Sequence, residues 1–314
     1  MESLARWLSQ LREVEERNEA VEFVKSRLLF IGNEEVIHLA HIAFPDLARP
    51  LIGRRVAREL RRPFWSPLCL RGETYSKLLR SCLFLGLSDG AHMDLFRRAN
   101  SELSNEQVFG YYDLSGDKAD DMLGRLSAEL GERYFRLLFV LDDFSGSGLS
   151  CMRVETDGKY HGKIHKVLEG LFTEGKPLNR LFDLTNLEVH VILYVATTHA
   201  LSYLQQAIGE WREQKGVRFS YSVSCAQELP GETCVTENDG MYKISARYFD
   251  RSIIDEHYSK GDCSRPYLGF DGCALPLVFS HNTPNNSIPL LWFDGVGTKY
   301  RGLFPRVGRH KSAT

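Results

Sequence analysis

Short apolar runs alternate with amphipathic stretches through the middle of this 314-residue chain. Apolar residues fill runs of strand length at 82–87, 135–141, 187–196 and 217–223, and they recur at helical spacing in the stretches 89–100, 119–130, 163–172 and 200–214. Buried strands that alternate with helices are typical of a parallel sheet covered on both faces. The pattern therefore predicts an α/β fold, with a mainly parallel sheet flanked by helices.

Helical periodicity dominates the beginning of the chain. Apolar residues at positions 4, 7, 8, 11 and 14 share one helical face, Asn33 can cap a helix that reaches residue 42, and Pro45 begins another that reaches about residue 60. We therefore predict an N-terminal helical extension over residues 1–66 and an α/β domain over residues 67–314. The segment 227–247 is polar and rich in turn formers, so we expect an inserted loop or hairpin near 227–250.

An acidic pair and a loop of glycine and serine follow the run at 135–141. Asp142 and Asp143 come directly after this run, where side chains emerge from a parallel sheet into the cleft that binds ligands. In the next residues, glycines let backbone amides approach a phosphate, serine hydroxyls add donors, and a helix start would complete the nest. The expected phosphate-binding residues are Ser145, Gly146, Ser147, Gly148, Leu149 and Ser150.

Adjacent carboxylates at this position suit ribose hydroxyls or magnesium. Asp142 and Asp143 are therefore the expected catalytic residues, and also the expected magnesium site, acting through the ligand or through water. A Gly/Ser turn beside an acidic helix cap would have a similar composition. The complete order of strand, acidic pair and loop favours the phosphate-binding interpretation.

The same segment resembles the phosphoribosyl diphosphate motif of type I phosphoribosyltransferases. That motif consists of an apolar strand, two acidic residues, a short variable stretch, a glycine and a hydroxyl residue, which correspond here to residues 138–141, Asp142 and Asp143, residues 144–147, Gly148 and Ser150. Several nucleobase-using members have an acidic residue where this chain has Gly146. The likeness to the purine-salvage enzymes is therefore limited.

A second loop fits the cleft that this resemblance implies. Ser88, Asp89, Gly90 and Ala91 follow the first strand, where the fold usually has its diphosphate loop, and Gly90 would permit the unusual backbone of such a loop. Asp89 stands where a basic residue is common. A helix N-cap by Ser88 or Asp89 would explain this loop equally well.

A third segment follows an apolar run at 275–279 that we expect to be a strand. Its amides, hydroxyl and imidazole could form an acceptor site or a hood over the ligand, although Asx turns around two prolines would explain the same composition. The residues concerned are His281, Asn282, Thr283, Asn285 and Asn286.

These segments, together with residues 85–105 and 303–306, resemble the phosphoribosyltransferase-like family of prokaryotic conflict systems, of the PRTase-CE type. The likeness runs over residues 27–306. It implies a type I phosphoribosyltransferase fold and a role beside partner proteins in antiphage defence. It does not identify a substrate.

Composition and charge exclude several other classes of protein. Lys and Arg number 39 against 41 Asp and Glu, so a net charge of -2 gives no overall attraction to nucleic acid or membrane. The apolar run at 189–196 is far shorter than a membrane helix, and we expect a soluble, cytoplasmic protein. The 7 cysteines are scattered without a C-x-x-C pair, which argues against a disulfide framework or a zinc knuckle.

Two basic features of the sequence each allow a functional interpretation and a simpler structural one. Arginines at positions 54, 55, 58, 61 and 62 would gather on one side of a helix, as an anion or nucleic-acid patch or, more simply, as a solvated face. His161 and His165 have metal-ligand spacing on a helix, but Lys159, Lys163 and Lys166 surround them and favour a solvated face.

The leading hypothesis is a magnesium-dependent ribosyl-transfer enzyme that binds phosphoribosyl diphosphate or a related ribose 5-phosphate compound. In this hypothesis Asp142 and Asp143 hold the ribose diol, and the loop from Ser145 to Ser150 holds the 5-phosphate. The alternative is a non-catalytic sensor of nucleotides or phosphoribosyl compounds that reports to a partner protein. Nucleic-acid binding by the arginine helix is a third, weakly supported possibility.

Overall fold

The structure is a computed structural model that describes residues 2–294 and 300–306. The chain packs into two compact units. The larger unit is Val36–Leu229, and the smaller unit combines the residues up to Glu35 with those from Pro230 onward. The predicted extension over residues 1–66 and domain over residues 67–314 follow other boundaries and stay a prediction.

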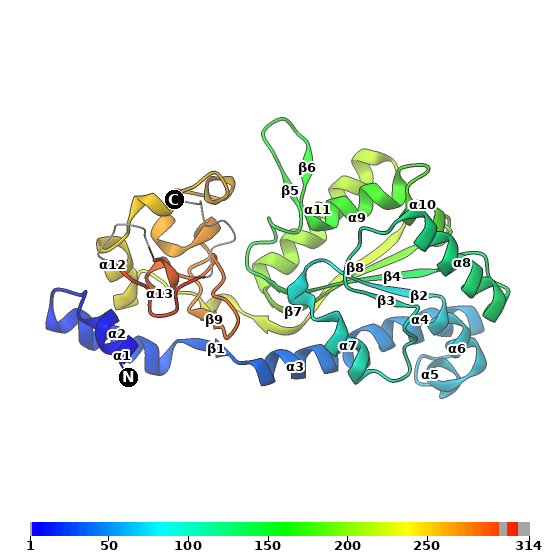
Figure 1. The fold of residues 1–314 in the computed structure, drawn as a ribbon, viewed down its shortest axis with the longest axis horizontal. Helices are drawn as coiled ribbons and strands as arrows, with labels where there is room; N and C mark the ends of the chain where they lie inside the picture. Colours follow the sequence, from blue (N-terminus) through cyan, green and yellow to red (C-terminus); the bar gives the residue numbers. More distant parts are fainter. Residues whose placement is uncertain (1, 295–299, 307–314) are drawn as a thin grey trace. The chain divides into compact units, whose positions relative to one another are not determined.

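The larger unit is built on a five-stranded parallel sheet, which confirms the predicted α/β fold (Figure 1). Its strands, in spatial order, are β3 (Val108–Phe109), β2 (Cys82–Gly86), β4 (Leu137–Ser145), β7 (Glu188–Thr197) and β8 (Ser220–Leu229). Strand β8 begins later than expected because Gly216, with φ 65°, ends the preceding helix and Val217 still bonds back to Arg212.

Alternate residues of the strands face two different layers of helices. Leucine and valine side chains, such as Leu138 and Val140, pack against helices on one side of the sheet, and Phe139 points to the other side, where its ring stacks on Phe84 at 4.8 Å. The first layer consists of α8 (Gly116–Leu130), α9 (Lys163–Phe172) and α11 (Thr198–Lys215), and the second includes α4 (Arg49–Leu60) and α7 (Met93–Ala99) (Figure 1). These elements agree closely with the helical stretches expected from the sequence.

The remaining elements of the larger unit connect this framework. Helix α3 (Asn33–Ile42) runs through a π-helical segment, η1 (Ala43–Ala48), into α4, so the two helices expected on either side of Pro45 are continuous. Helices α5 (Leu68–Arg71), α6 (Glu73–Arg80) and α10 (Pro177–Leu181) are short. Strands β5 (Arg153–Val154) and β6 (Tyr160–His161) form a hairpin that projects from this unit (Figure 1).

The smaller unit brings the two ends of the described chain together. Strand β1 (Leu29–Ile31) pairs in parallel with β9 (Leu277–Phe279), so the strand expected near 275–279 exists but belongs to this two-stranded sheet. Around it lie α1 (Glu2–Leu8), α2 (Val14–Ser26), α12 (Gly240–Arg247) and α13 (Pro289–Trp292). Helix α12 lies where we expected a loop or hairpin, because Met241, Ile244 and Ser245 share a buried face at helical spacing.

Candidate functional site

The acidic pair lies on β4, the central strand of the larger unit. The Asp142 side chain is 0% exposed, and each of its oxygens accepts a hydrogen bond. Ser88 Oγ donates to Oδ1, and Lys163 Nζ donates to Oδ2 at 2.6 Å. Asp143 is partly exposed, and its Oδ1 accepts the Phe144 amide at 2.9 Å. The two carboxylates therefore differ in surroundings, although they are adjacent in sequence.

The ion pair of Asp142 and Lys163 dominates the electrostatics of this site. Burial raises the pKa of Asp142 to about 6, Lys163 opposes this shift, and the charge of Asp143 adds to it. Burial works against the charged form of Lys163 as well, but Asp142 outweighs it and the pKa of the ammonium is raised. At neutral pH both partners are therefore charged.

Cys151, beside the loop, is not an activated nucleophile. Its side chain is 1% exposed, and burial raises the pKa of the thiol to about 12. Because the thiolate is the reactive form, this cysteine is inert at neutral pH. It packs under the loop as a small apolar side chain.

The expected phosphate loop is held by a hydrogen bond at Gly146 and by close packing at Gly148. Thr197, at the end of β7, donates from Oγ1 to the Gly146 carbonyl at 2.6 Å. Gly148 has φ 85°, a left-handed conformation, and a Cβ there would lie 2.5 Å from the Tyr203 ring. Within the described residues, the backbone amides of Gly146, Ser147 and Gly148 donate to no other protein group. Buried amides normally have a partner, so this loop can accept an anion.

No helix start completes this loop, which corrects the expectation from the sequence. The chain runs through the β5–β6 hairpin before α9 begins at Lys163. The first amides of α9 are already used by the loop, since Lys163 donates to Ser150 O at 3.3 Å and Ile164 donates to Cys151 O at 2.8 Å. The first backbone amides of α9 are therefore not available to a phosphate, and the helix start does not form part of an anion site.

The second loop, Ser88 to Ala91, contacts the acidic pair directly. Ser88 does not cap a helix with its side chain, because its hydroxyl is bonded to Asp142. Asp89 begins the short 3-10 helix η2 (Asp89–Ala91) and accepts a hydrogen bond from Tyr111. Gly90 is not among the glycines with positive φ, and a Cβ at Gly90 would lie 2.3 Å from Asp143 Oδ2. This glycine permits the close approach of loop and carboxylate.

Replacing Gly90 by alanine should push this loop and Asp143 apart. We expect binding of a sugar phosphate to the site to fall at least about 10-fold, because a shift of this size disturbs a preorganised contact. Gly124→Ala is the matched control, since a Cβ at Gly124 of α8 meets nothing within 4 Å. Calorimetric titration of both variants checks the prediction, and equal affinities would contradict it.

The expected acceptor or hood residues lie in the smaller unit, whereas the acidic pair lies in the larger one. Thr283 Oγ1 donates to Phe304 O at 3.1 Å, and Asn286 Nδ2 donates to Phe270 O at 3.3 Å. Both side chains are buried and hold the segment in place. A role of these two residues, or of His281, Asn282 and Asn285, beside the ligand stays a prediction.

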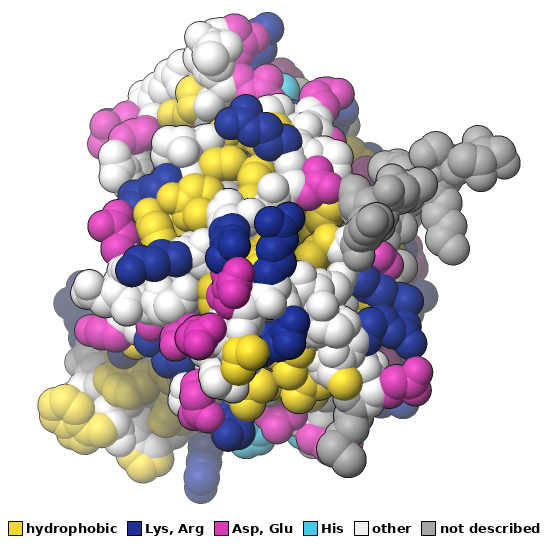
Figure 2. Space-filling view, turned by 90° about the vertical axis from the view of Figure 1, so that its left-hand side faces the viewer, with side chains coloured by type: hydrophobic (Ala, Val, Ile, Leu, Met, Phe, Trp, Pro, Cys, Tyr) yellow, Lys and Arg dark blue, Asp and Glu magenta, His cyan; other side chains and the backbone are white. Residues whose placement is uncertain are grey.

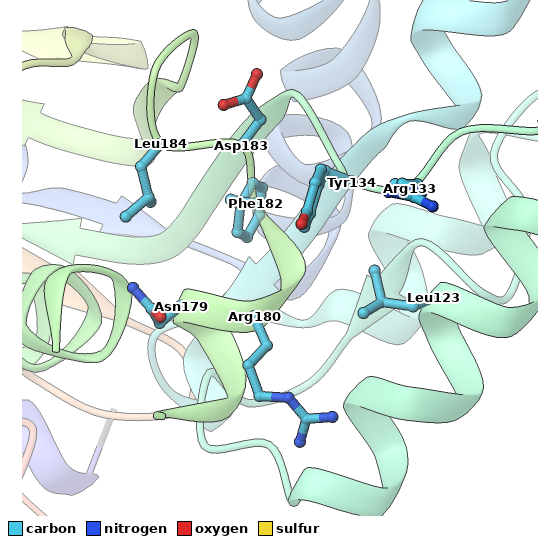
Figure 3. A pocket seen from close by; sticks show the side chains of 8 residues that line it. All are labelled: Leu123, Arg133, Tyr134, Asn179, Arg180, Phe182, Asp183 and Leu184. Atoms are coloured by element: carbon cyan, nitrogen blue, oxygen red, sulfur yellow. The ribbon is translucent and has the colours of Figure 1, made fainter. Parts of the chain in front are cut away.

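A hollow of about 650 Å³ lies elsewhere in the larger unit (Figure 3). Tyr134 and Arg133 precede β4, and Phe182 and Leu184 precede β7, so this hollow lies at the amino ends of the strands. The acidic pair lies toward the opposite ends. Because ligands of parallel sheets bind at the carboxyl ends, the loop beside Asp142 is the better candidate site.

The arginines of α4 are partly neutralised within the protein. Arg55 and Arg58 each contact Glu188 Oε1 at 2.7 Å, and Arg55 also pairs with Glu59. Figure 2 faces the smaller unit and not α4, and on that face too basic side chains are interspersed with acidic and hydrophobic ones. These observations give no added support to a nucleic-acid patch.

Sequence reasoning missed Lys163, which we had assigned to a solvated helix face. It lies 21 positions after Asp142, beyond the hairpin, so no local spacing links the two residues. The available signal was a basic residue at the first position of the helix that follows the loop. The same signal would have identified many surface lysines as well.

A parallel α/β sheet with an acidic pair and an anion-accepting loop on its central strand defines a phosphoribosyltransferase-like protein. The chain belongs to the PRTase-CE family, which matches residues 4–306 and therefore spans both units. Searches of curated proteins and of solved structures gave no significant match. Among the residues described, no helix is long and apolar enough to cross a membrane.

Proposed function

We propose that the larger unit binds phosphoribosyl diphosphate or a related ribose 5-phosphate compound. The observation that carries this proposal is the loop of Gly146, Ser147 and Gly148, whose amides are available to an anion beside the acidic pair of buried Asp142 and partly exposed Asp143. The loop holds the 5-phosphate, and the partly exposed Asp143 faces the ribose diol. Buried Asp142 does not contact the ligand itself and acts through its hydrogen-bond partners, Ser88 and Lys163.

We further propose that the protein transfers the ribosyl group. The bond between C1 of the ribose and the diphosphate oxygen breaks, and diphosphate leaves with the electron pair. An acceptor atom forms the new bond to C1 and loses its proton. The acidic pair stabilises the positive charge that develops on the sugar, so this chemistry needs positioning and electrostatics more than a protein nucleophile.

Magnesium was expected at Asp142 and Asp143 through the ligand or through water, and the surroundings of Asp142 do not suit an ion bound directly by that side chain. Both Asp142 oxygens have donors, and one of these is the Lys163 ammonium. Among the described residues, no group of three or more His, Cys, Asp or Glu side chains could hold a metal. Magnesium remains in the proposal only as an ion carried by the diphosphate of the ligand, and no step here depends on it.

Titration of phosphoribosyl diphosphate into the protein, followed by an assay for diphosphate, tests both parts of the proposal. We expect saturable binding and a release of diphosphate that depends on the protein. Inorganic phosphate and glucose 6-phosphate serve as ligand controls, because they lack the ribose diol in this geometry. Absence of binding by both ribose 5-phosphate and phosphoribosyl diphosphate would reject the site.

A sensor without turnover is the second candidate, and Gly146 favours it. This residue stands where nucleobase-using phosphoribosyltransferases have an acidic group, and it is buried in the loop. Such a sensor would bind phosphoribosyl diphosphate without releasing diphosphate. We propose that either form acts beside a partner protein in antiphage defence, as the resemblance to the phosphoribosyltransferase-like family of conflict systems implies.

A further inference from the structure

Lys163 forms hydrogen bonds to residues on both sides of the candidate phosphate loop. Its backbone amide donates to Ser150 O at 3.3 Å, and its side chain ends at Asp142, with Nζ 2.6 Å from Oδ2. The two fixed points lie at opposite ends of the segment from Asp142 to Ser150. Lys163 therefore links the two ends of this segment, and its ammonium lies at Asp142 of the acidic pair.

The exposures of the two partners assign them different roles. The Asp142 side chain is 0% exposed, whereas 28% of the Lys163 side chain is exposed. A ligand that enters from solvent can thus reach the lysine while the aspartate remains behind it. An ammonium has three donors, and Asp142 uses one of them, so two remain for a ligand.

The carboxylates of this site make a cation necessary for binding an anion. Asp142 and Asp143 directly precede the expected phosphate loop, Ser88 of the second loop contacts Asp142, and Asp89 of that loop stands where a basic residue is common. An oxyanion beside three carboxylates would be repelled unless a fixed positive charge compensates it. Lys163 supplies this charge from a helix that neither loop contains.

We propose that Lys163 is the ligand-binding cation of this site, that Asp142 positions it, and that together they receive a phosphate oxygen of the sugar phosphate without a protein-bound metal ion. This inference rests on the proposed function and names the residue that gives the site its affinity for an anion. Asp142 is then a positioning residue, and Asp143 is the carboxylate nearer to the sugar.

The first test uses the wild-type protein and ribose 5-phosphate, with calorimetry in buffers that contain either magnesium or EDTA. We expect the two affinities to agree within about 2-fold, because the cation of the site belongs to the chain. Binding that disappears in EDTA would overturn the inference while leaving the proposed function intact. Absence of binding in both buffers would reject the proposed function itself.

The second test compares Lys163→Met, Lys163→Arg and Lys166→Met. The first should weaken ribose 5-phosphate binding by about 10-fold to 100-fold, as expected for the loss of a charge-assisted hydrogen bond. Lys163→Arg should recover part of this loss, since it keeps the charge. Lys166 is exposed on the same helix, so its variant should bind as the wild type does. Equal affinities of Lys163→Met and wild type would contradict the proposal.

A third measurement does not depend on the folding of any variant. Acetic anhydride modifies accessible lysines of the wild-type protein, and mass spectrometry gives the rate at each position. Saturating ribose 5-phosphate should slow the modification of Lys163 several-fold and leave Lys166 unchanged. An unchanged rate at Lys163 with bound ligand would show that the ammonium does not contact it.

Discussion

Replacing Asp142 and Asp143 together by asparagine should weaken the binding of ribose 5-phosphate by at least about 100-fold. The variant loses the charged acceptor that faces the ribose diol and also the partner that holds Lys163 at the loop. Hydrogen bonds to charged groups contribute about 1.5–3 kcal/mol each, and roughly 3 kcal/mol corresponds to this change in affinity. Calorimetric titration of both proteins measures it.

A second ligand shows whether this loss arises at the sugar. The wild type should bind ribose 5-phosphate more tightly than 2-deoxyribose 5-phosphate, and the double variant should lose this preference. Asp157→Asn is the matched control, because Asp157 is an exposed carboxylate paired with Lys159 in the same unit. Circular dichroism verifies that each variant is folded. A folded double variant that still prefers ribose would remove the acidic pair from the site.

Replacing Glu188 by glutamine should lower the free energy of unfolding by about 2–3 kcal/mol. The Glu188 side chain is 6% exposed at the start of β7, and it neutralises Arg55 and Arg58 of α4. Removing its charge leaves Arg55, which is 19% exposed, with Glu59 as its remaining ion-pair partner. We place the effect below the usual 3–5 kcal/mol for a broken buried pair, because Arg58 is largely solvated. Urea denaturation measures the change.

The pH dependence of unfolding distinguishes this ion pair from simple packing. Burial would raise the pKa of Glu188, but hydrogen bonds from His190 and Arg55 and the charge of Arg58 lower it to about 2. The carboxylate thus contributes stability above its ordinary pKa of 4.5, and this contribution is lost as the pH falls toward 2. Glu188→Gln should therefore lose less stability on acidification than the wild type. Glu73→Gln, which removes an exposed partner of Lys77, should leave the denaturation midpoint nearly unchanged.

The central sheet was predictable because its inner strands, β2, β4 and β7, are almost entirely buried. Every residue of β7 is buried, and its apolar run at 191–196 has strand length and is rich in β-branched residues. The acidic pair and the glycine loop were also visible, since they are contiguous in sequence. The contacts of Asp142 with Ser88 and Lys163 were not predictable, because these residues lie 54 and 21 positions away in the sequence.

The smaller unit was harder to predict for a different reason. Strand β1 has three residues of intermediate or high exposure, and its partner β9 lies near the other end of the chain. Short strands of this kind resemble ordinary loop sequence. Helix α12 was missed because turn-forming residues flank it on both sides. Its helical periodicity is apparent only from which of its positions are buried.

The parallel pairing of β1 with β9 also sets the order in which the protein can fold during its synthesis. The larger unit is one continuous segment, so it can fold as soon as residue 229 has left the ribosome. The smaller unit cannot complete its two-stranded sheet until β9 has been synthesised, and until then β1 has no strand to pair with. A nascent chain can therefore carry a folded α/β unit while its N-terminal segment is still accessible to chaperones.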